Sequence, residues 1–330
     1  MIKIGLGGSA IANLVIFLNQ NYYVMLIAWM FNAATQFALW PSVFKIMASQ
    51  LPRSEKKKNA FYMSFCTAFG LLVSYVAAAL LPAWQYNFLL STVISLGLLI
   101  AMHFVCKKVD RYMLPDKNTM TEHIREKETH GHTMKSLMLQ SGLMLMIIIA
   151  LIRTTIDQGS KTMAPTMLME SYGDISASIG NILNIFIILS GIAGTLVVKY
   201  LIYPKLIKNE VTGLIVLLAL TIPLTVLLRM IGTVSSTTII VSMCLIAFLM
   251  TAASLYTTYY NLNFAAFGKD GAVAGISNCA ASVAMIIQSY GFNVVADNFG
   301  WKTVSDLWIV LIVTASILAV ITLPIFNKFK

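Results

Sequence analysis

The sequence predicts an all-α membrane protein with about ten transmembrane helices. Of its 330 residues, 58% are hydrophobic and only 11% are charged, whereas a soluble domain carries about 25% charged residues. The apolar residues form long runs, and about 20 consecutive apolar residues span a bilayer as a helix. The runs do not alternate in polarity as the strands of a membrane barrel do, which favours helices.

Ten apolar segments are long enough to be transmembrane spans. Each is expected to be a helix, because a segment in lipid must satisfy its backbone hydrogen bonds internally. In chain order, the expected spans are residues 4–19, 22–48, 58–82, 86–107, 138–170, 176–201, 211–231, 237–264, 272–296 and 303–327.

The distribution of Lys and Arg predicts how the chain crosses the membrane. If the N-terminus is cytoplasmic, the inner loops and the termini hold almost every cation, and the outer loops keep only Arg229 and Lys302. Because cytoplasmic loops are enriched in Lys and Arg, we expect a multi-pass protein of the cell (cytoplasmic) membrane with both termini in the cytoplasm. This orientation also accounts for the net charge of +10. The expected partner is therefore the lipid bilayer and not nucleic acid.

A long charged segment divides the chain. The predicted domains are an N-terminal helical bundle of four spans (1–108), a cytoplasmic linker (109–136) and a C-terminal bundle of six spans (137–330). Many transporters have two matching halves, so two helices are expected to be missing at the front. The histidines of the linker could bind a metal, but a solvated charged loop is the favoured interpretation. No metal or other cofactor is expected.

The most informative polar residues lie in the span at 138–170. Arg153, Asp157 and Lys161 are spaced by four residues, which places them on one face of a helix. Ionisable side chains inside a span are unfavourable and often functional, and a carboxylate between two cations can stay charged. The triplet is expected to be a substrate or proton site. Two alternatives remain open: an ion-pair ladder that locks neighbouring helices, or a Lys161 that extends toward the membrane surface.

Other spans carry polar stripes that are candidates for lining a cavity. Tyr256 and Tyr260 lie on one face of the span at 237–264, Asn278 lies in the span at 272–296, and Asn32 and Gln36 lie in the second span. The alternative for each is that it hydrogen-bonds between helices and only supports their packing.

The chain resembles the major facilitator superfamily, and within it the organophosphate:phosphate antiporter group, which transports glycerol phosphate and sugar phosphates. Three stretches, similar to that family's fourth, seventh and eleventh-to-twelfth helices, carry the resemblance. They are Trp29 to Gln36 with Trp40-Pro41 and Leu51-Pro52-Arg53; Gly159 to Pro165 with Glu170; and Gly275 to Gly291 with Asn298-Phe299-Gly300-Trp301 and Trp308. The resemblance implies a two-bundle architecture in which the present helices are the third to the twelfth, so that the chain is N-terminally incomplete.

One departure from the family pattern bears on the substrate. The antiporters have a phosphate-binding arginine two residues before the glycine that corresponds to Gly159, and here that position is Asp157. Arg153 lies one turn away. Phosphate binding needs fixed cationic forks, so the phosphorylated substrate of the family is not expected to carry over.

The function expected from these observations is secondary active transport of a small polar or anionic solute by alternating access, without enzymatic chemistry. Asp157 is the expected proton or cation site, and Arg153 and Lys161 would tune it or contact an anionic substrate. The protein is expected to be a monomer, with a proton or an anion as coupled ion. The alternative is a membrane receptor, or an inactive truncated relative, that binds a ligand without moving it. A polytopic membrane enzyme is disfavoured because no loop carries a paired acidic motif.

Overall fold

The computed structural model describes residues 1–37, 39, 42–43, 53–112, 137–138, 140–173, 175–267 and 269–329. Every regular element in these ranges is a helix. Most of the predicted linker, including its histidines, and the Trp40-Pro41 pair lie outside the described residues. The chain forms two compact units, and each is described by itself.

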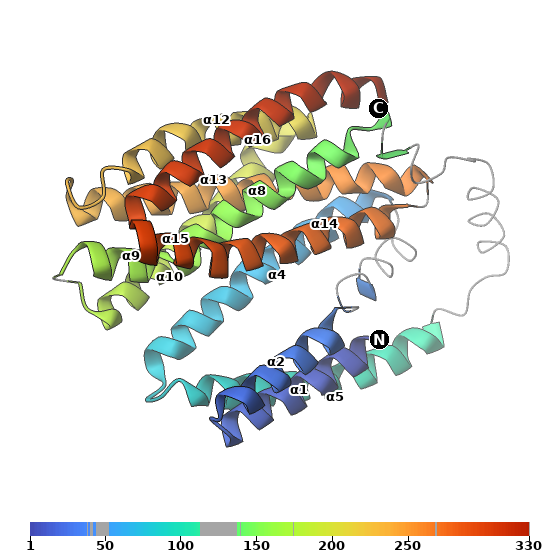
Figure 1. Ribbon diagram of the computed structural model, residues 1–330. Helices are drawn as coiled ribbons and strands as arrows, with labels where there is room; N and C mark the ends of the chain where they lie inside the picture. Colours follow the sequence, from blue (N-terminus) through green and yellow to red (C-terminus); the bar gives the residue numbers. More distant parts are fainter. Residues whose placement is uncertain are drawn as a thin grey trace. The chain divides into compact units, whose positions relative to one another are not determined.

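The first unit comprises Met1–Leu51 and Leu80–His132. Its described helices are α1 (Ile2–Leu18), α2 (Tyr22–Gln36) and α5 (Gln85–Tyr112), and α1 packs against both of the others (Figure 1). Gly8 of α1 faces Thr35, and a side chain at position 8 would collide with it. Small residues let membrane helices approach closely in this way.

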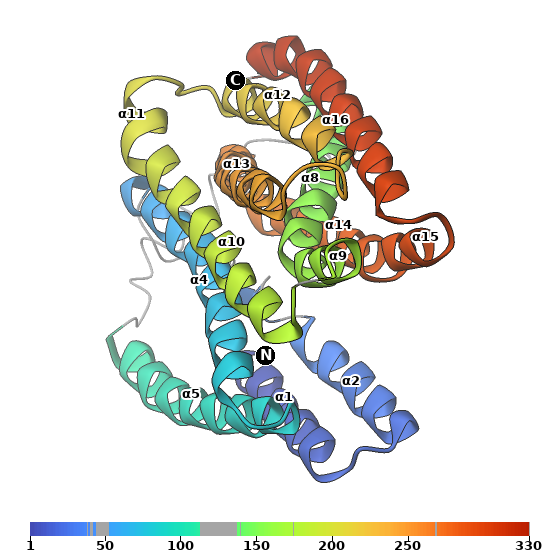
Figure 2. The ribbon, with the colours of Figure 1, turned by 90° about the vertical axis from the view of Figure 1, so that its left-hand side faces the viewer.

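The second unit comprises Pro52–Ala79 and Thr133–Lys330. Two helices form its centre, α8 and α13, and Figure 2 shows α10, α12, α14 and α16 around them. Its elements are α4 (Arg53–Leu80), α8 (Leu143–Thr162), α9 (Ala164–Ser171), α10 (Ala177–Val197), the π-helical turn η1 (Val198–Ile202), α11 (Tyr203–Lys205), α12 (Glu210–Leu228), α13 (Ser236–Leu262), the 3-10 turn η2 (Asn263–Phe267), α14 (Asp270–Ile286), the π-helical turn η3 (Ile287–Gly291), α15 (Phe292–Phe299) and α16 (Trp301–Phe329).

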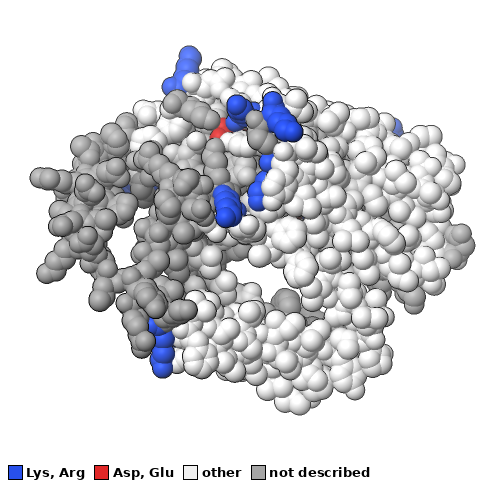
Figure 3. Space-filling model, turned by 180° about the vertical axis from the view of Figure 1, so that it is seen from behind, with Lys and Arg blue, Asp and Glu red and all other residues white. Residues whose placement is uncertain are grey.

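The predicted all-helical membrane fold is confirmed. Within the described residues, eight helical stretches are long and apolar enough to cross a membrane, and the Ile2–Leu18 helix is apolar but shorter. The eight are Phe61–Leu80, Gln85–Lys107, Leu143–Thr162, Ile182–Ile202, Glu210–Leu228, Ser236–Leu262, Gly271–Phe299 and Trp301–Phe329. Much of the surface in Figure 3 is uncharged, as expected for side chains that face lipid.

Two predicted boundaries are corrected by backbone chemistry. The predicted span 138–170 is not one helix: α8 ends at Thr162, and α9 begins with Pro165 in its first turn. Proline has no N–H to continue a helical ladder but fits the first turn of a new helix. The span predicted to end at residue 296 extends to Phe299, where Gly300 adopts a φ of +80°. This left-handed conformation suits glycine and ends the helix.

The compact units do not follow the predicted domain boundaries, because α4 groups with the helices that follow residue 137. The division into a four-span bundle (1–108), a linker (109–136) and a six-span bundle (137–330) stays a prediction.

Candidate functional site

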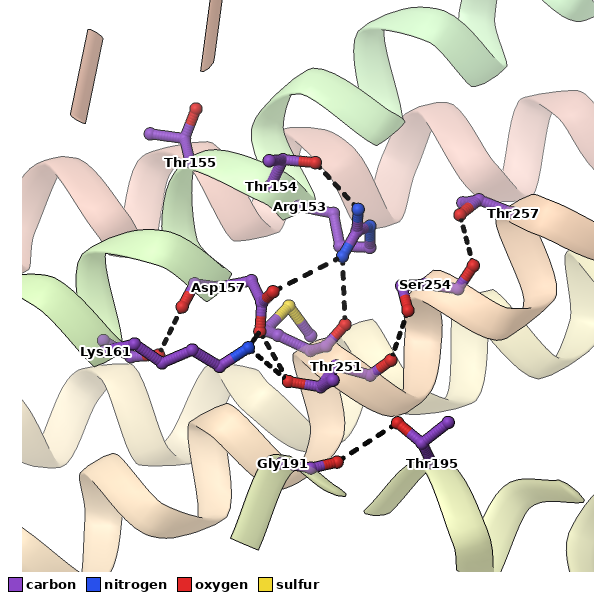
Figure 4. Close-up of polar contacts among 12 residues, drawn as sticks. Arg153, Thr154, Thr155, Asp157, Lys161, Gly191, Thr195, Thr251, Ser254 and Thr257 are labelled. Atoms are coloured by element: carbon purple, nitrogen blue, oxygen red, sulfur yellow. Dashed lines mark hydrogen bonds and ion pairs between the residues drawn. The ribbon is translucent and has the colours of Figure 1, made fainter. Parts of the chain in front are cut away.

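The candidate site is built on the second half of α8. An apolar first half, Leu143 to Ile152, precedes Arg153, Asp157 and Lys161, whose spacing of four places them on one face. All three are buried, with exposed fractions of 8%, 5% and 3%. The structure turns this face toward α13 (Figure 4).

Asp157 is the centre of the cluster. Its Oδ1 accepts hydrogen bonds from Lys161 Nζ at 2.6 Å and from Thr251 Oγ1 at 2.8 Å. Lys161 Nζ also lies 2.6 Å from Thr251 Oγ1, which closes a triangle between α8 and α13. Arg153 is further away, with its Nη1 3.9 Å from Asp157 Oδ2. The carboxylate is thus paired closely with Lys161 and loosely with Arg153.

Arg153 has its own anchors. Its Nη1 donates to the carbonyl of Met250 at 3.2 Å, and its Nη2 donates to Thr154 Oγ1 at 2.7 Å. Its Nε is buried and has no hydrogen-bond partner among the described residues. The cluster of Arg153, Asp157 and Lys161 thus buries two basic side chains with one acidic side chain.

Two glycines permit the close packing that surrounds the cluster. A Cβ on Gly191 of α10 would lie 2.7 Å from Thr251 Oγ1, so the absence of a side chain lets Thr251 fit between α10 and Asp157. A Cβ on Gly159 of α8 would lie 2.6 Å from the ring of Trp308 in α16. The small residues thus set how near α10 and α16 approach the two central helices.

At the end of α8, the carbonyl oxygen of Lys161 lacks its usual helical hydrogen bond. A helix would pair the carbonyl of Lys161 with the N–H four residues later, but that residue is Pro165, which has none. The hydroxyl of Tyr75 in α4 donates to this carbonyl at 3.5 Å. Because Pro165 lies four residues after Lys161, a backbone carbonyl one turn from Asp157 lacks its helical donor.

The structure does not bring the other predicted residues of the second unit into this cluster. Tyr256 donates to the carbonyl of Ile207 at 3.2 Å, and Tyr260 donates to the carbonyl of Ser141 at 2.9 Å. Asn278 is half-buried in α14. The two tyrosines tie the end of α13 to neighbouring backbone, which matches the packing alternative.

Asn32 and Gln36 belong to a separate polar cluster in the first unit. Gln36 Nε2 donates to Asn32 Oδ1 at 2.9 Å and to Ser9 Oγ of α1 at 2.7 Å. Asn13 adds a bond from its Nδ2 to the carbonyl of Ser9 at 2.8 Å. These contacts join α1 to α2 through side chains.

One alternative for the charged triplet is wrong. Lys161 does not extend toward the membrane surface, because its side chain is 3% exposed and its Nζ is bonded to Asp157. The ion-pair ladder remains open, since Arg153 and Lys161 both bond to residues of α13.

Comparison with known proteins identifies the family. The sequence profile described as Major Facilitator Superfamily matches residues 1–289. The chain belongs to the Major Facilitator Superfamily. The predicted superfamily is therefore confirmed, and with it a multi-pass membrane protein of a transporter family. No curated protein sequence matches this chain. The resemblance to the organophosphate:phosphate antiporters stays a prediction, as does the absence of two N-terminal helices.

Solved structures of this superfamily share the fold. The human organic anion transporter MFSD10 (TETRAN) is 13% identical, with a TM-score of 0.71 over 96% of this chain and 76% of that one. The E. coli fucose:proton symporter FucP is 12% identical, with a TM-score of 0.64 over 97% of this chain and 83% of that one. A bacterial homologue of the iron transporter ferroportin is 11% identical, with a TM-score of 0.62 over 97% of this chain and 82% of that one. At these identities the likeness is one of fold alone.

Proposed function

We propose that this protein is a secondary active transporter that moves a small anionic solute by alternating access, with its binding site at the cluster around Asp157. The observation that carries the proposal is that α8 buries two basic side chains and one acidic side chain, a formal excess of positive charge. An uncompensated charge is strongly unfavourable in a membrane interior, so such groups pair with an opposite charge. An anionic substrate supplies that charge.

In this proposal Asp157 couples substrate binding to proton movement. The carboxylate and an anionic substrate compete for the same two cations, Arg153 and Lys161. Protonation of Asp157 removes the competitor and frees Lys161 for the anion, so proton and anion binding favour each other. Binding and conformational change suffice for this cycle, and the chain's residues need no covalent step or cofactor.

Two structural relatives agree with this proposal. MFSD10 is an organic anion transporter, and FucP is a fucose:proton symporter. The proposed setting is the cytoplasmic membrane, with both termini in the cytoplasm and a monomer as the working unit.

The proposal is tested with the purified protein and a thermal-shift screen of carboxylates, phosphates, amino acids and neutral sugars. We expect anions to stabilise the protein, and Lys161→Gln to weaken their binding by about tenfold or more, because a charge-assisted hydrogen bond is lost. The matched control is Arg229→Gln, which also removes one positive charge, but from an exposed pair with Asp306. Stabilisation by neutral sugars and not by anions would contradict the proposal.

A receptor that binds without transport is the second candidate. The bonds from Arg153 and Lys161 to α13 favour it, because they tie α8 to α13 and so favour a site that keeps one arrangement. Uptake by liposomes of an anion that binds the purified protein separates the two. Accumulation driven by a pH gradient supports transport, and binding without uptake supports the receptor.

A further inference from the structure

A buried side-chain amide, that of Asn184, lies on α10. The side chain of Asn184 is 0% exposed. Neither its Oδ1 nor its Nδ2 has a partner among the described residues. Most buried polar groups in proteins are paired, and a buried amide that is not paired destabilises the fold. A group absent from the structure is therefore expected to bind there.

The position of Asn184 relates it to the charged cluster. It precedes Gly191 by seven residues, about two helical turns, so both lie on the same face of α10. Gly191 is the residue against which Thr251 packs. Asn184 thus faces the interior of the second unit, further along α10 from the contact with Thr251.

Tyr75 connects Asn184 to Lys161. Its hydroxyl is close to the Asn184 amide, although no described group forms a hydrogen bond of good geometry with either amide atom. The same hydroxyl donates to the Lys161 carbonyl that Pro165 leaves unpaired. Asn184 and Tyr75 therefore lie beside the Lys161 end of the cluster.

We propose that Asn184 and Tyr75 form the uncharged half of the binding site and recognise hydroxyl groups on the anionic substrate. This rests on the proposed function, in which Arg153 and Lys161 take the anionic group. The amide has an accepting carbonyl oxygen and a donating NH₂ group, and hydroxyl groups can bond to both. The substrate class is then a small hydroxylated carboxylate. A site built to hydrogen-bond a hydroxyl discriminates against an analogue that lacks it, because its own polar groups are then left unpaired.

Three carboxylates with the same three-carbon skeleton test this inference: propionate, lactate and glycerate, which carry no, one and two hydroxyl groups. Affinities are measured by calorimetry on the full chain and on Asn184→Leu. We expect the wild type to bind glycerate about tenfold or more tightly than propionate. Asn184→Leu should bind propionate as the wild type does and lose the preference.

Three further variants complete the design. Tyr75→Phe should reduce the preference in part, and Lys161→Gln should weaken all three ligands alike. Asn293→Leu is the matched control, because Asn293 is exposed on α15 and donates to the carbonyl of Ser289 in the adjoining turn η3. This variant should keep the wild-type preference for glycerate. A higher unfolding temperature of ligand-free Asn184→Leu is also expected, because leucine removes the unpaired amide.

The outcomes separate the inference from the function on which it rests. If propionate, lactate and glycerate bind the wild type equally, or if Asn184→Leu keeps the preference, Asn184 holds only an internal water and the inference is overturned while the anion site stands. If no anion binds, the proposed function fails as well.

Discussion

Asp157 lies between two cations at different distances, so the loss of each of the three residues should have a different effect on stability. Lys161 is bonded directly at 2.6 Å, and Arg153 is held 3.9 Å away by its own anchors on α13 and Thr154. Loss of the carboxylate would leave two buried positive charges close together. Loss of Lys161 would leave Asp157 with Arg153 and Thr251.

This arrangement predicts the stability of Asp157 variants. Asp157→Asn should lower the free energy of unfolding by about 3–5 kcal/mol, because it leaves buried cations unpaired. The double variant Asp157→Asn/Lys161→Gln should recover part of this loss, because one of those cations is gone. Thermal unfolding of the purified protein measures both.

The control for this cycle is the exposed pair of Arg229 and Asp306, whose side chains are 64% and 47% exposed. Asp306→Asn should change stability by less than about 1 kcal/mol, as for other surface ion pairs. Equal effects of Asp157→Asn and Asp306→Asn would contradict a buried charge cluster.

The sequence predicts one side of the site but not the other. A spacing of four residues places Arg153, Asp157 and Lys161 together on any α-helix, so their common face follows from helical geometry. Thr251 is one of several hydroxyl residues on α13, and nothing local distinguishes it. Its role arises because Gly191 leaves room for it against α10. That Asn184 has no hydrogen-bond partner among the described residues is likewise a property of packing, which the sequence does not display.

At the scale of helices, glycines set the contact between α10 and α13. Gly194 of α10 faces the backbone of Phe248 in α13, and an added Cβ would collide with the Phe248 carbonyl oxygen. A Cβ added to Gly275 of α14 would meet no atom of another helix within 4 Å in the described part of the chain, so it would enter open space. The two glycines are chemically identical and differ only in their neighbours.

Gly194→Ala is therefore expected to reduce stability by about 1–3 kcal/mol, because backbone atoms of α13 would have to move. Gly275→Ala should be neutral or stabilising by up to about 1 kcal/mol, because alanine has the higher helix propensity. Thermal unfolding of the two variants in one detergent checks the pair, and an equal loss in both would show that α10 and α13 are not in close contact.

Helix ends were the least predictable part of the fold. Long apolar runs predict that a helix crosses the membrane, but they do not show where it breaks. The predicted span 138–170 missed the break before Pro165, although proline disfavours a continuous helix. Tyr256 and Tyr260 are candidates either for lining a cavity or for supporting helix packing, and in the structure both donate to backbone carbonyls. Hydroxyls serve both purposes, and only the fold distinguishes them.

At the scale of the whole molecule, the proposed orientation can be tested with the two ends of one helix. α12 runs from Glu210 to Leu228, about 28 Å at 1.5 Å per residue, which is close to the thickness of a bilayer core. Exposed Lys205 precedes this helix and exposed Arg229 follows it. The two cations are therefore expected on opposite sides of the membrane.

Single cysteines at these positions test the orientation once the four native cysteines are replaced by serine. In intact cells, a membrane-impermeant thiol reagent should label Arg229→Cys. It should label Lys205→Cys only after permeabilisation, because an excess of Lys and Arg marks the cytoplasmic side. The reverse pattern would place the termini outside the cytoplasm.

Because of Pro165, the hydrogen bonding of the Lys161 carbonyl depends on a neighbouring helix and not on its own. The carbonyl of Lys161 has lost its helical donor and meets the Tyr75 hydroxyl at 3.5 Å, a long hydrogen bond. The stretching frequency of a carbonyl falls as its hydrogen bond strengthens. The C=O stretching frequency of Lys161 should therefore change when the distance between α4 and α8 changes. Infrared spectroscopy of this one carbonyl would report helix movement beside the charged cluster.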